Sequence, residues 1–86
     1  MSLGIIVQPE AELDISDAYD WYEERSSGLG AQFLGAIDEA LLLASREPEI
    51  FQRVHRSVRR ALIHRFPYGI FYTFEPDRMV VLAVMH

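Results

Sequence analysis

The chain has 86 residues, of which half are hydrophobic and none is cysteine, and its formal net charge at neutral pH is −5. This length fits one domain with a modest core, the apolar content excludes a disordered chain, and the lack of cysteine excludes a disulfide framework and a thiolate metal site. No apolar run reaches the ~20 residues of a membrane-spanning helix and no export signal begins the chain, so we expect a single cytoplasmic domain over residues 1–86.

The charge is divided unevenly along the chain. Residues 1–49 contain eleven acidic residues and two arginines, whereas residues 50–86 contain two acidic residues and six arginines, and there is no lysine. The planar guanidinium of arginine suits carboxylate and phosphate groups. The second part therefore offers either a solvated basic face or a surface for an acidic partner.

The first part of the chain predicts a strand followed by an amphipathic helix. Residues 4–8 are rich in β-branched side chains and end at Pro9, which suits the first turn of a helix. Hydrophobic residues then follow helical spacing up to Arg25, which predicts a helix over residues 9–25. Within this helix we expect a solvated acidic face formed by Asp14, Asp17 and Asp20. We expect the aromatic side chains of the helix to pack on a sheet, namely those of Tyr19, Trp21 and Tyr22.

A second helix follows a short break that contains two glycines. Apolar residues at helical spacing predict it over residues 29–46, and Pro48 requires it to stop by Glu47. The short break makes the two helices an antiparallel hairpin. The segment 28–30 is not a phosphate-binding loop, because it lacks the third glycine and joins two helices.

The rest of the chain predicts three strands joined by turns, over residues 58–66, 69–75 and 78–85. The apolar run from Met79 to Met85 does not alternate, which predicts a central strand buried on both faces, with the first strand parallel to it. The fold class is therefore α+β, in the order β-α-α-β-β-β, with a helical hairpin on one face of a four-stranded, mostly antiparallel sheet. The predicted core consists of Ile15, Tyr19, Phe33, Ile37, Leu41, Leu82 and Val84.

The strand predicted over residues 58–66 has arginine and apolar side chains on both faces. Such a mixed pattern indicates an edge strand or a bulge. A basic edge suits an acidic peptide that adds as a further strand, and it also suits phosphate. We favour the acidic peptide, since it accounts for the neighbouring aromatic residues as well as for the charge.

Several short motifs occur in a fixed order along nearly the whole chain, from Ile5 to His86. They are Asp20-Trp21-Tyr22-Glu23, Gly28-Leu29-Gly30 before Phe33, Pro48 and Phe51, Val58-Arg59-Arg60, Arg65-Phe66-Pro67-Tyr68 and Ala83-Val84-Met85-His86. With the order of the elements, they resemble the RelE/ParE-type toxins of type II toxin–antitoxin systems. The Trp-Tyr-Glu helix and the Arg-Phe-Pro-Tyr turn look closer to the ParE-like, or plasmid stabilisation, branch.

The resemblance implies a bacterial toxin that a cognate antitoxin neutralises. ParE-like members poison DNA gyrase, so we expect a toxin that acts by protein binding, with gyrase as its target. The alternative is a RelE-like, ribosome-dependent mRNA endonuclease that needs no metal. A second alternative is an inactive remnant, because members commonly continue past the histidine that ends the last strand, whereas this chain stops at His86.

Cleavage of RNA without a metal needs a base for the 2′-hydroxyl, an acid for the leaving oxygen and cations around the phosphate. Arginine supplies only the cations, and histidine titrates near neutral pH. A nuclease would therefore use His64, Arg60, Arg65, Tyr72 and His86. No histidine has a carboxylate beside it in the sequence, so we expect that the purified protein alone does not cleave RNA.

The candidate residues for antitoxin binding are Arg59, Arg60, Arg65, Phe66 and Tyr68. Without the antitoxin this surface would be exposed, and a homodimer through the same surface is a further expectation. The three histidines do not have the spacing of metal ligands, so we expect neither a metal nor a cofactor.

Overall fold

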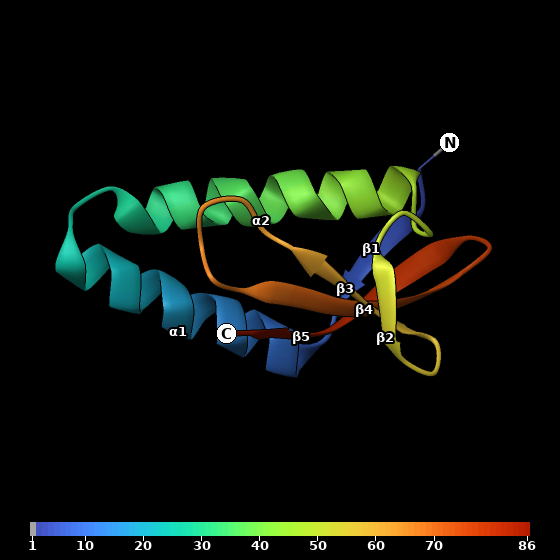
Figure 1. Ribbon diagram of the computed structural model, residues 1–86. Helices are drawn as coiled ribbons and strands as arrows, with labels where there is room; N and C mark the ends of the chain where they lie inside the picture. The colour runs from blue at the N-terminus through green and yellow to red at the C-terminus, as the bar shows by residue number, and fades with distance from the viewer. Residues whose placement is uncertain (1) are drawn as a thin grey trace.

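Two helices form a hairpin that packs against one face of a five-stranded sheet in the computed structural model, which describes residues 2–86 (Figure 1). Both helices have the predicted bounds, and neither helix of residues 2–86 is long and apolar enough to cross a membrane. The elements are β1 (Gly4–Val7), α1 (Pro9–Arg25), α2 (Leu29–Arg46), β2 (Gln52–His55), β3 (Val58–Leu62), β4 (Gly69–Glu75) and β5 (Arg78–Met85).

The strands lie in the order β1-β5-β4-β3-β2. The β1 strand pairs with β5 in parallel, and the other neighbours are antiparallel, so the two helices form the crossover between β1 and the rest of the sheet. The α+β class, the helical hairpin on one face and the interior position of the last strand are thus confirmed.

The sheet has five strands, so the prediction of four was wrong, and β3 is not the edge. The missed strand, β2, has four exposed residues and no alternation of apolar and polar side chains, which removes the usual sequence signal. It joins β3 through Arg56 and Ser57, and Arg56 has a φ of 51°, where turn sequences usually have glycine or asparagine. The predicted strand over residues 58–66 ends at Leu62.

A β-bulge explains why the apolar residues of β5 do not alternate. Tyr72 pairs with Val81 and Phe71 pairs with Ala83, so Leu82 is an extra residue on β5. The bulge changes the phase of the strand, and Met79, Val81 and Val84 are all buried. Leu82 and Ala83 are only half-buried, so the expectation that both faces of this strand are covered was wrong.

The two helices approach each other closely at Gly30. A Cβ atom there would lie 2.8 Å from a ring carbon of Tyr19, so only glycine fits without a shift of the ring. The carboxylate of Glu23 accepts hydrogen bonds of 2.9 Å from the backbone N–H groups of Gly28 and Gly30. Glu23 thereby satisfies free donors at the start of α2, a position where the helix dipole also favours an acid.

The core lies between the helices and the sheet. Phe33, Ile37 and Val84 are buried as predicted, whereas the other four predicted core residues, Ile15, Tyr19, Leu41 and Leu82, are half-buried. The largest fully buried side chain is that of Tyr72, which the sequence did not place in the core. The inner surfaces of the helices are rich in alanine, and the small side chains allow the layers to lie close together, as at Ala11, Ala18, Ala36, Ala40 and Ala44.

Candidate functional site

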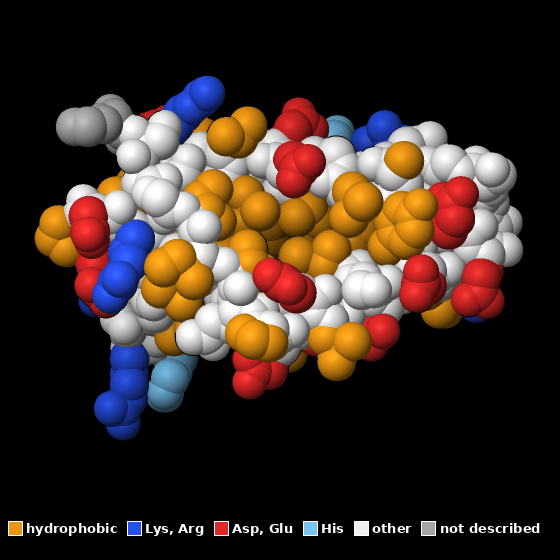
Figure 2. Space-filling view, turned by 180° about the vertical axis from the view of Figure 1, so that it is seen from behind, with side chains coloured by type: hydrophobic (Ala, Val, Ile, Leu, Met, Phe, Trp, Pro, Cys, Tyr) orange, Lys and Arg blue, Asp and Glu red, His pale blue; other side chains and the backbone are white. Residues whose placement is uncertain are grey.

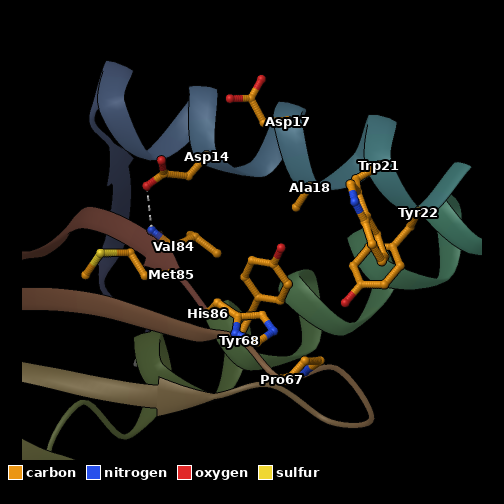
Figure 3. Close-up of a pocket in the computed structure, with 10 residues that line it drawn as sticks. All are labelled: Asp14, Asp17, Ala18, Trp21, Tyr22, Pro67, Tyr68, Val84, Met85 and His86. Carbon is orange, nitrogen blue, oxygen red and sulfur yellow. Dashed lines mark hydrogen bonds between the residues drawn. The ribbon is translucent and has the colours of Figure 1, made fainter. Parts of the chain in front are cut away.

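A hollow of about 680 Å³ lies between α1 and the end of β5 (Figure 3). We call it the α1–β5 recess. Its wall on α1 consists of Asp14, Asp17, Ala18, Trp21 and Tyr22. Its opposite wall consists of Pro67 and Tyr68, from the loop between β3 and β4, and of Val84, Met85 and His86 at the end of the chain.

The recess exists because β1 is shorter than its neighbour. β1 pairs with β5 only as far as Val7 and Val81, and the chain then turns into α1 at Pro9. The rest of β5 continues without a neighbouring strand on that side. Asp14 lies there and accepts a hydrogen bond of 2.9 Å from the backbone N–H of Val84 through its Oδ2 atom (Figure 3).

Aromatic rings form much of the recess. The ring centroids of Tyr22 and Tyr68 are 6.2 Å apart, those of Tyr68 and His86 are 5.3 Å apart, and the ring of Trp21 meets that of Tyr22 edge-on at 5.1 Å. The hydroxyl of Tyr68 points toward α1 (Figure 3). Burial raises the pKa of Tyr22, and the nearby Tyr68 raises it further, so the Tyr22 hydroxyl is neutral at physiological pH.

The formal charge of the recess is negative. Asp14 and Asp17 line it, and its wall contains no arginine. The nearest basic side chain on α1 is that of Arg25, whose guanidinium lies 3.4 Å from the centroid of the Trp21 ring and donates to the backbone carbonyl of Trp21. The face of the molecule seen in Figure 2 has a hydrophobic band with acidic side chains on both sides, and basic side chains lie mainly toward one end.

A smaller hollow of about 400 Å³ lies between α2 and the loop that follows β3. His64, Arg65 and Phe66 line one side of it, and residues of α2 line the other. The Nη2 atom of Arg65 donates a hydrogen bond of 3.0 Å to Oε1 of Gln32. This bond ties the loop to the helix, so the guanidinium of Arg65 is already partly engaged within the chain.

The family model described as the ParE toxin of the type II toxin–antitoxin system parDE matches residues 5–86. The chain belongs to the ParE toxin family. A solved structure titled as the chromosomal ParDE TA system from P. aeruginosa is similar in fold, with a TM-score of 0.71 at 13% sequence identity, and the match covers 99% of this chain and 96% of that chain. No curated protein matches. The resemblance to a ParE-like toxin is thus confirmed.

In this ParE-family protein, the five residues named for a nuclease do not meet at one place. Tyr72 is fully buried, and its hydroxyl donates a hydrogen bond of 2.7 Å to the carbonyl of Pro48. Arg60 pairs with Phe71 on the outer face of the sheet, which is the face without helices, opposite to that of Tyr72. His64 and Arg65 line the smaller hollow, and His86 lines the recess.

The residues named for antitoxin binding are divided in a similar way. Arg59 is half-buried and donates to the carbonyl of Phe51 at 2.7 Å and to that of Glu49 at 3.2 Å, so it holds the segment before β2. Arg60 is exposed. Phe66 and Tyr68 belong to an aromatic cluster with Phe33 and Tyr22, in which ring centroids are 4.9 to 6.2 Å apart.

No group of three side chains of histidine or acidic type within residues 2–86 could hold a metal ion. The burial of Tyr72 also affects its acidity. Burial raises its pKa, and the nearby Arg59 acts in the opposite direction. A tyrosine with this environment keeps its proton near neutral pH and is not positioned to give it to a substrate.

The recess was not predicted from the sequence. Asp17, Ala18 and Trp21 follow Asp14 by three, four and seven residues, which places all four on one stripe of α1. That signal was present in the sequence, but it was interpreted as a solvated acidic face, and Asp17 and Asp20 are indeed exposed. The expectation that Trp21 packs on the sheet was wrong, because its side chain is 49% exposed. The opposite wall comes from segments about fifty residues or more further along the chain, and only the fold brings them together.

Proposed function

We propose that this ParE-family toxin acts by binding a protein target, DNA gyrase, and that a cognate antitoxin neutralises it. The observation that carries the proposal is the separation of the residues that could cleave RNA. Tyr72 lies inside the protein, Arg60 lies on the outer face of the sheet, and His86 lies at the recess.

A metal-free nuclease must bring its acid, its base and its cations to the same phosphate. Only His64 and Arg65 share a surface here, and Arg65 donates to Gln32. Two side chains, one of which is engaged within the protein, supply less than the reaction needs. Binding without chemistry makes no such demand, which supports action by protein binding over RNA cleavage, and gyrase is proposed as the bound target on the ground of membership of the ParE toxin family.

The antitoxin is proposed to bind at the β2–β3 hairpin. Four arginines and no acidic residue lie between residues 53 and 60, and β2 is an edge strand with four exposed residues. An acidic segment could add to this edge through backbone hydrogen bonds, with its carboxylates near the guanidinium groups. Arg60 is the best of the predicted anchors, because it is exposed while Arg59 and Arg65 make internal hydrogen bonds.

The test measures gyrase supercoiling and mRNA integrity with the same purified protein. We expect inhibited supercoiling, relief of that inhibition by the antitoxin, and an intact message in primer extension on translated mRNA. The matched variants are His64→Ala and Arg65→Ala, which remove the only two nuclease candidates that share a surface. Cuts at codon positions that disappear in either variant would support the nuclease instead, and no effect in either assay would support an inactive remnant.

A further inference from the structure

We propose that the α1–β5 recess binds an arginine side chain that a protein partner presents between apolar residues. The proposal concerns a surface other than the basic β2–β3 hairpin, and it does not depend on whether the target of the toxin is gyrase. It rests on the size, the charge and the aromatic walls of the recess, and on the state of the neighbouring strand edge.

The size suits a side chain with its neighbours. Pockets that bind ligands in proteins have volumes of roughly 300–1,000 Å³, and this hollow has about 680 Å³. The walls are largely apolar or aromatic, with Val84, Met85 and Trp21 among them. Asp14, Asp17 and the hydroxyl-bearing Tyr68 add a few polar groups to this lining, and apolar walls with a small number of polar groups are typical of binding sites.

The charge selects a cation. Asp14 and Asp17 line the recess, and its wall has no arginine that would neutralise them. The backbone N–H of Val84 donates to one carboxylate oxygen of Asp14, so the other oxygen remains able to accept a hydrogen bond from a ligand. A phosphate or a carboxylate would be repelled here. A bound metal ion is disfavoured, because residues 2–86 contain no group of three ligands for one.

The aromatic walls favour arginine over lysine. A guanidinium is planar, stacks on aromatic rings and can bind a carboxylate with two parallel hydrogen bonds, whereas an ammonium is a compact and strongly hydrated charge. Trp21, Tyr22, Tyr68 and His86 all present rings to the recess. The guanidinium of Arg25 already lies 3.4 Å from the centroid of the Trp21 ring, so one face of that ring is occupied within the chain and the arginine of a partner would stack on the ring surfaces that remain.

The strand edge beside the recess determines how the partner docks. Beyond Val81, β5 has no neighbouring strand on the side of β1. The backbone N–H of Val84, which such a strand could have bonded, donates to the carboxylate of Asp14 instead. An incoming strand would have to displace that carboxylate before it could pair with β5. The partner is therefore held through its side chain in the recess, and not by addition of a strand to β5.

The probe is the peptide N-acetyl-Leu-Arg-Leu-amide, compared with two peptides in which lysine or citrulline, the neutral isostere of arginine, replaces the arginine. Trp21 is the single tryptophan of the chain and lines the recess, so its fluorescence reports binding. Amide NMR shifts of Val84, Met85 and His86 locate the peptide. We expect saturable binding of the arginine peptide at about 0.15 M salt, and binding at least about fivefold weaker for the citrulline and lysine peptides.

Asp17→Asn should weaken binding of the arginine peptide by about three- to fivefold, the range of a partly exposed ion pair. The matched control is Asp20→Asn, which makes the same change of charge on the same helix outside the recess and should change affinity less than about twofold. The amide spectra of both variants establish that they are folded. Equal binding of the citrulline or lysine peptide, equal effects of the two variants, shifts that map elsewhere, or no binding at millimolar peptide would each overturn the proposal.

Discussion

Asp14 on α1 accepts a hydrogen bond of 2.9 Å from the backbone N–H of Val84 on β5. A side chain of the helix layer thus completes the pairing of a strand in the sheet, seventy residues further along the chain. The bond lies where β1 has already ended, so no backbone group takes its place. It fixes α1 over the end of β5 and thereby sets the width of the recess.

Replacement of Asp14 by alanine should therefore lower the free energy of unfolding by about 1–2 kcal/mol, because the N–H of Val84 loses its partner at a partly buried position. Urea unfolding measures the loss, and the amide of Val84 should exchange with solvent faster than in the wild type. Asp14→Asn keeps an acceptor oxygen and should retain most of the stability. Equal losses in the two variants would mean that the charge, and not the hydrogen bond, matters here.

Alanine substitutions at two glycines of α2 should change the free energy of unfolding in opposite directions. Gly30→Ala places a Cβ atom 2.8 Å from the ring of Tyr19 and 2.9 Å from a carboxylate oxygen of Glu23, so we expect a loss of about 1–3 kcal/mol. Gly35→Ala meets nothing within 4 Å and should gain about 0.5–1 kcal/mol from the better helix propensity of alanine. Chemical unfolding of both variants tests this, and a gain at both positions would show that the helices are not in close contact at Gly30.

The sequence predicted the regular elements well, because their signals are local. Helical spacing, Pro9 and Pro48 determine both helices to the residue. β2 was missed because its four residues are all exposed and therefore show no periodic pattern. The turn that follows it has Arg56 in the left-handed conformation, which is not a usual turn signal in a sequence.

The recess was missed for a different reason. It depends on where β1 ends relative to β5 and on contacts between α1 and residues 67–86. These are tertiary relationships that spacing along one element does not contain. The same holds for Tyr72, which lies on the same face of β4 as the buried Ile70, because spacing along β4 does not show which face the helices cover.

The loss of stability expected from replacing a hydrophobic residue by alanine increases with the burial of that residue. Phe33 has 0% exposure, so Phe33→Ala should cost about 3–5 kcal/mol, a large share of the stability of a domain of this size. Leu41 is half-buried, and Leu41→Ala should lie near 2 kcal/mol, at the low end of the range for leucine, roughly 2–5 kcal/mol. Leu13 is 61% exposed and serves as the control, with an expected change within about 0.5 kcal/mol. Thermal and urea unfolding compare the three variants, and similar values for Phe33 and Leu13 would contradict the packing.

Tyr72→Phe should reduce stability by about 1 kcal/mol at neutral pH, because the carbonyl of Pro48 loses its donor. Burial raises the pKa of Tyr72 above its ordinary value of 10.0, with Arg59 opposing the shift. The folded protein thus holds this proton more tightly than the unfolded chain. The stability that protonated Tyr72 contributes to the folded state is therefore complete below about pH 10, and it is lost as the pH rises through the pKa that Tyr72 has in the folded state.

Urea unfolding at about pH 8 and about pH 11 measures this dependence. The difference in stability between the wild type and Tyr72→Phe should narrow at the higher pH. The Tyr72→Phe variant should itself still become less stable as the pH rises. The reason is that burial also raises the pKa of Tyr22, so the folded state holds that proton more tightly than the unfolded chain. A difference that is constant over this range would mean that Tyr72 titrates alike in the folded and unfolded states.

The last prediction concerns the basic hairpin. Arg60 is exposed on β3 beside the edge strand β2, so Arg60→Glu should weaken the complex with an acidic antitoxin by about tenfold, mainly through a faster off-rate. Arg46→Glu, in the last turn of α2, makes the same change of net charge on a different element and should have a smaller effect. Surface plasmon resonance with immobilised antitoxin gives both rates for each variant. If the two reversals weaken binding equally, long-range attraction explains the effect and Arg60 is not an anchor. If neither changes the affinity, the antitoxin does not use this hairpin.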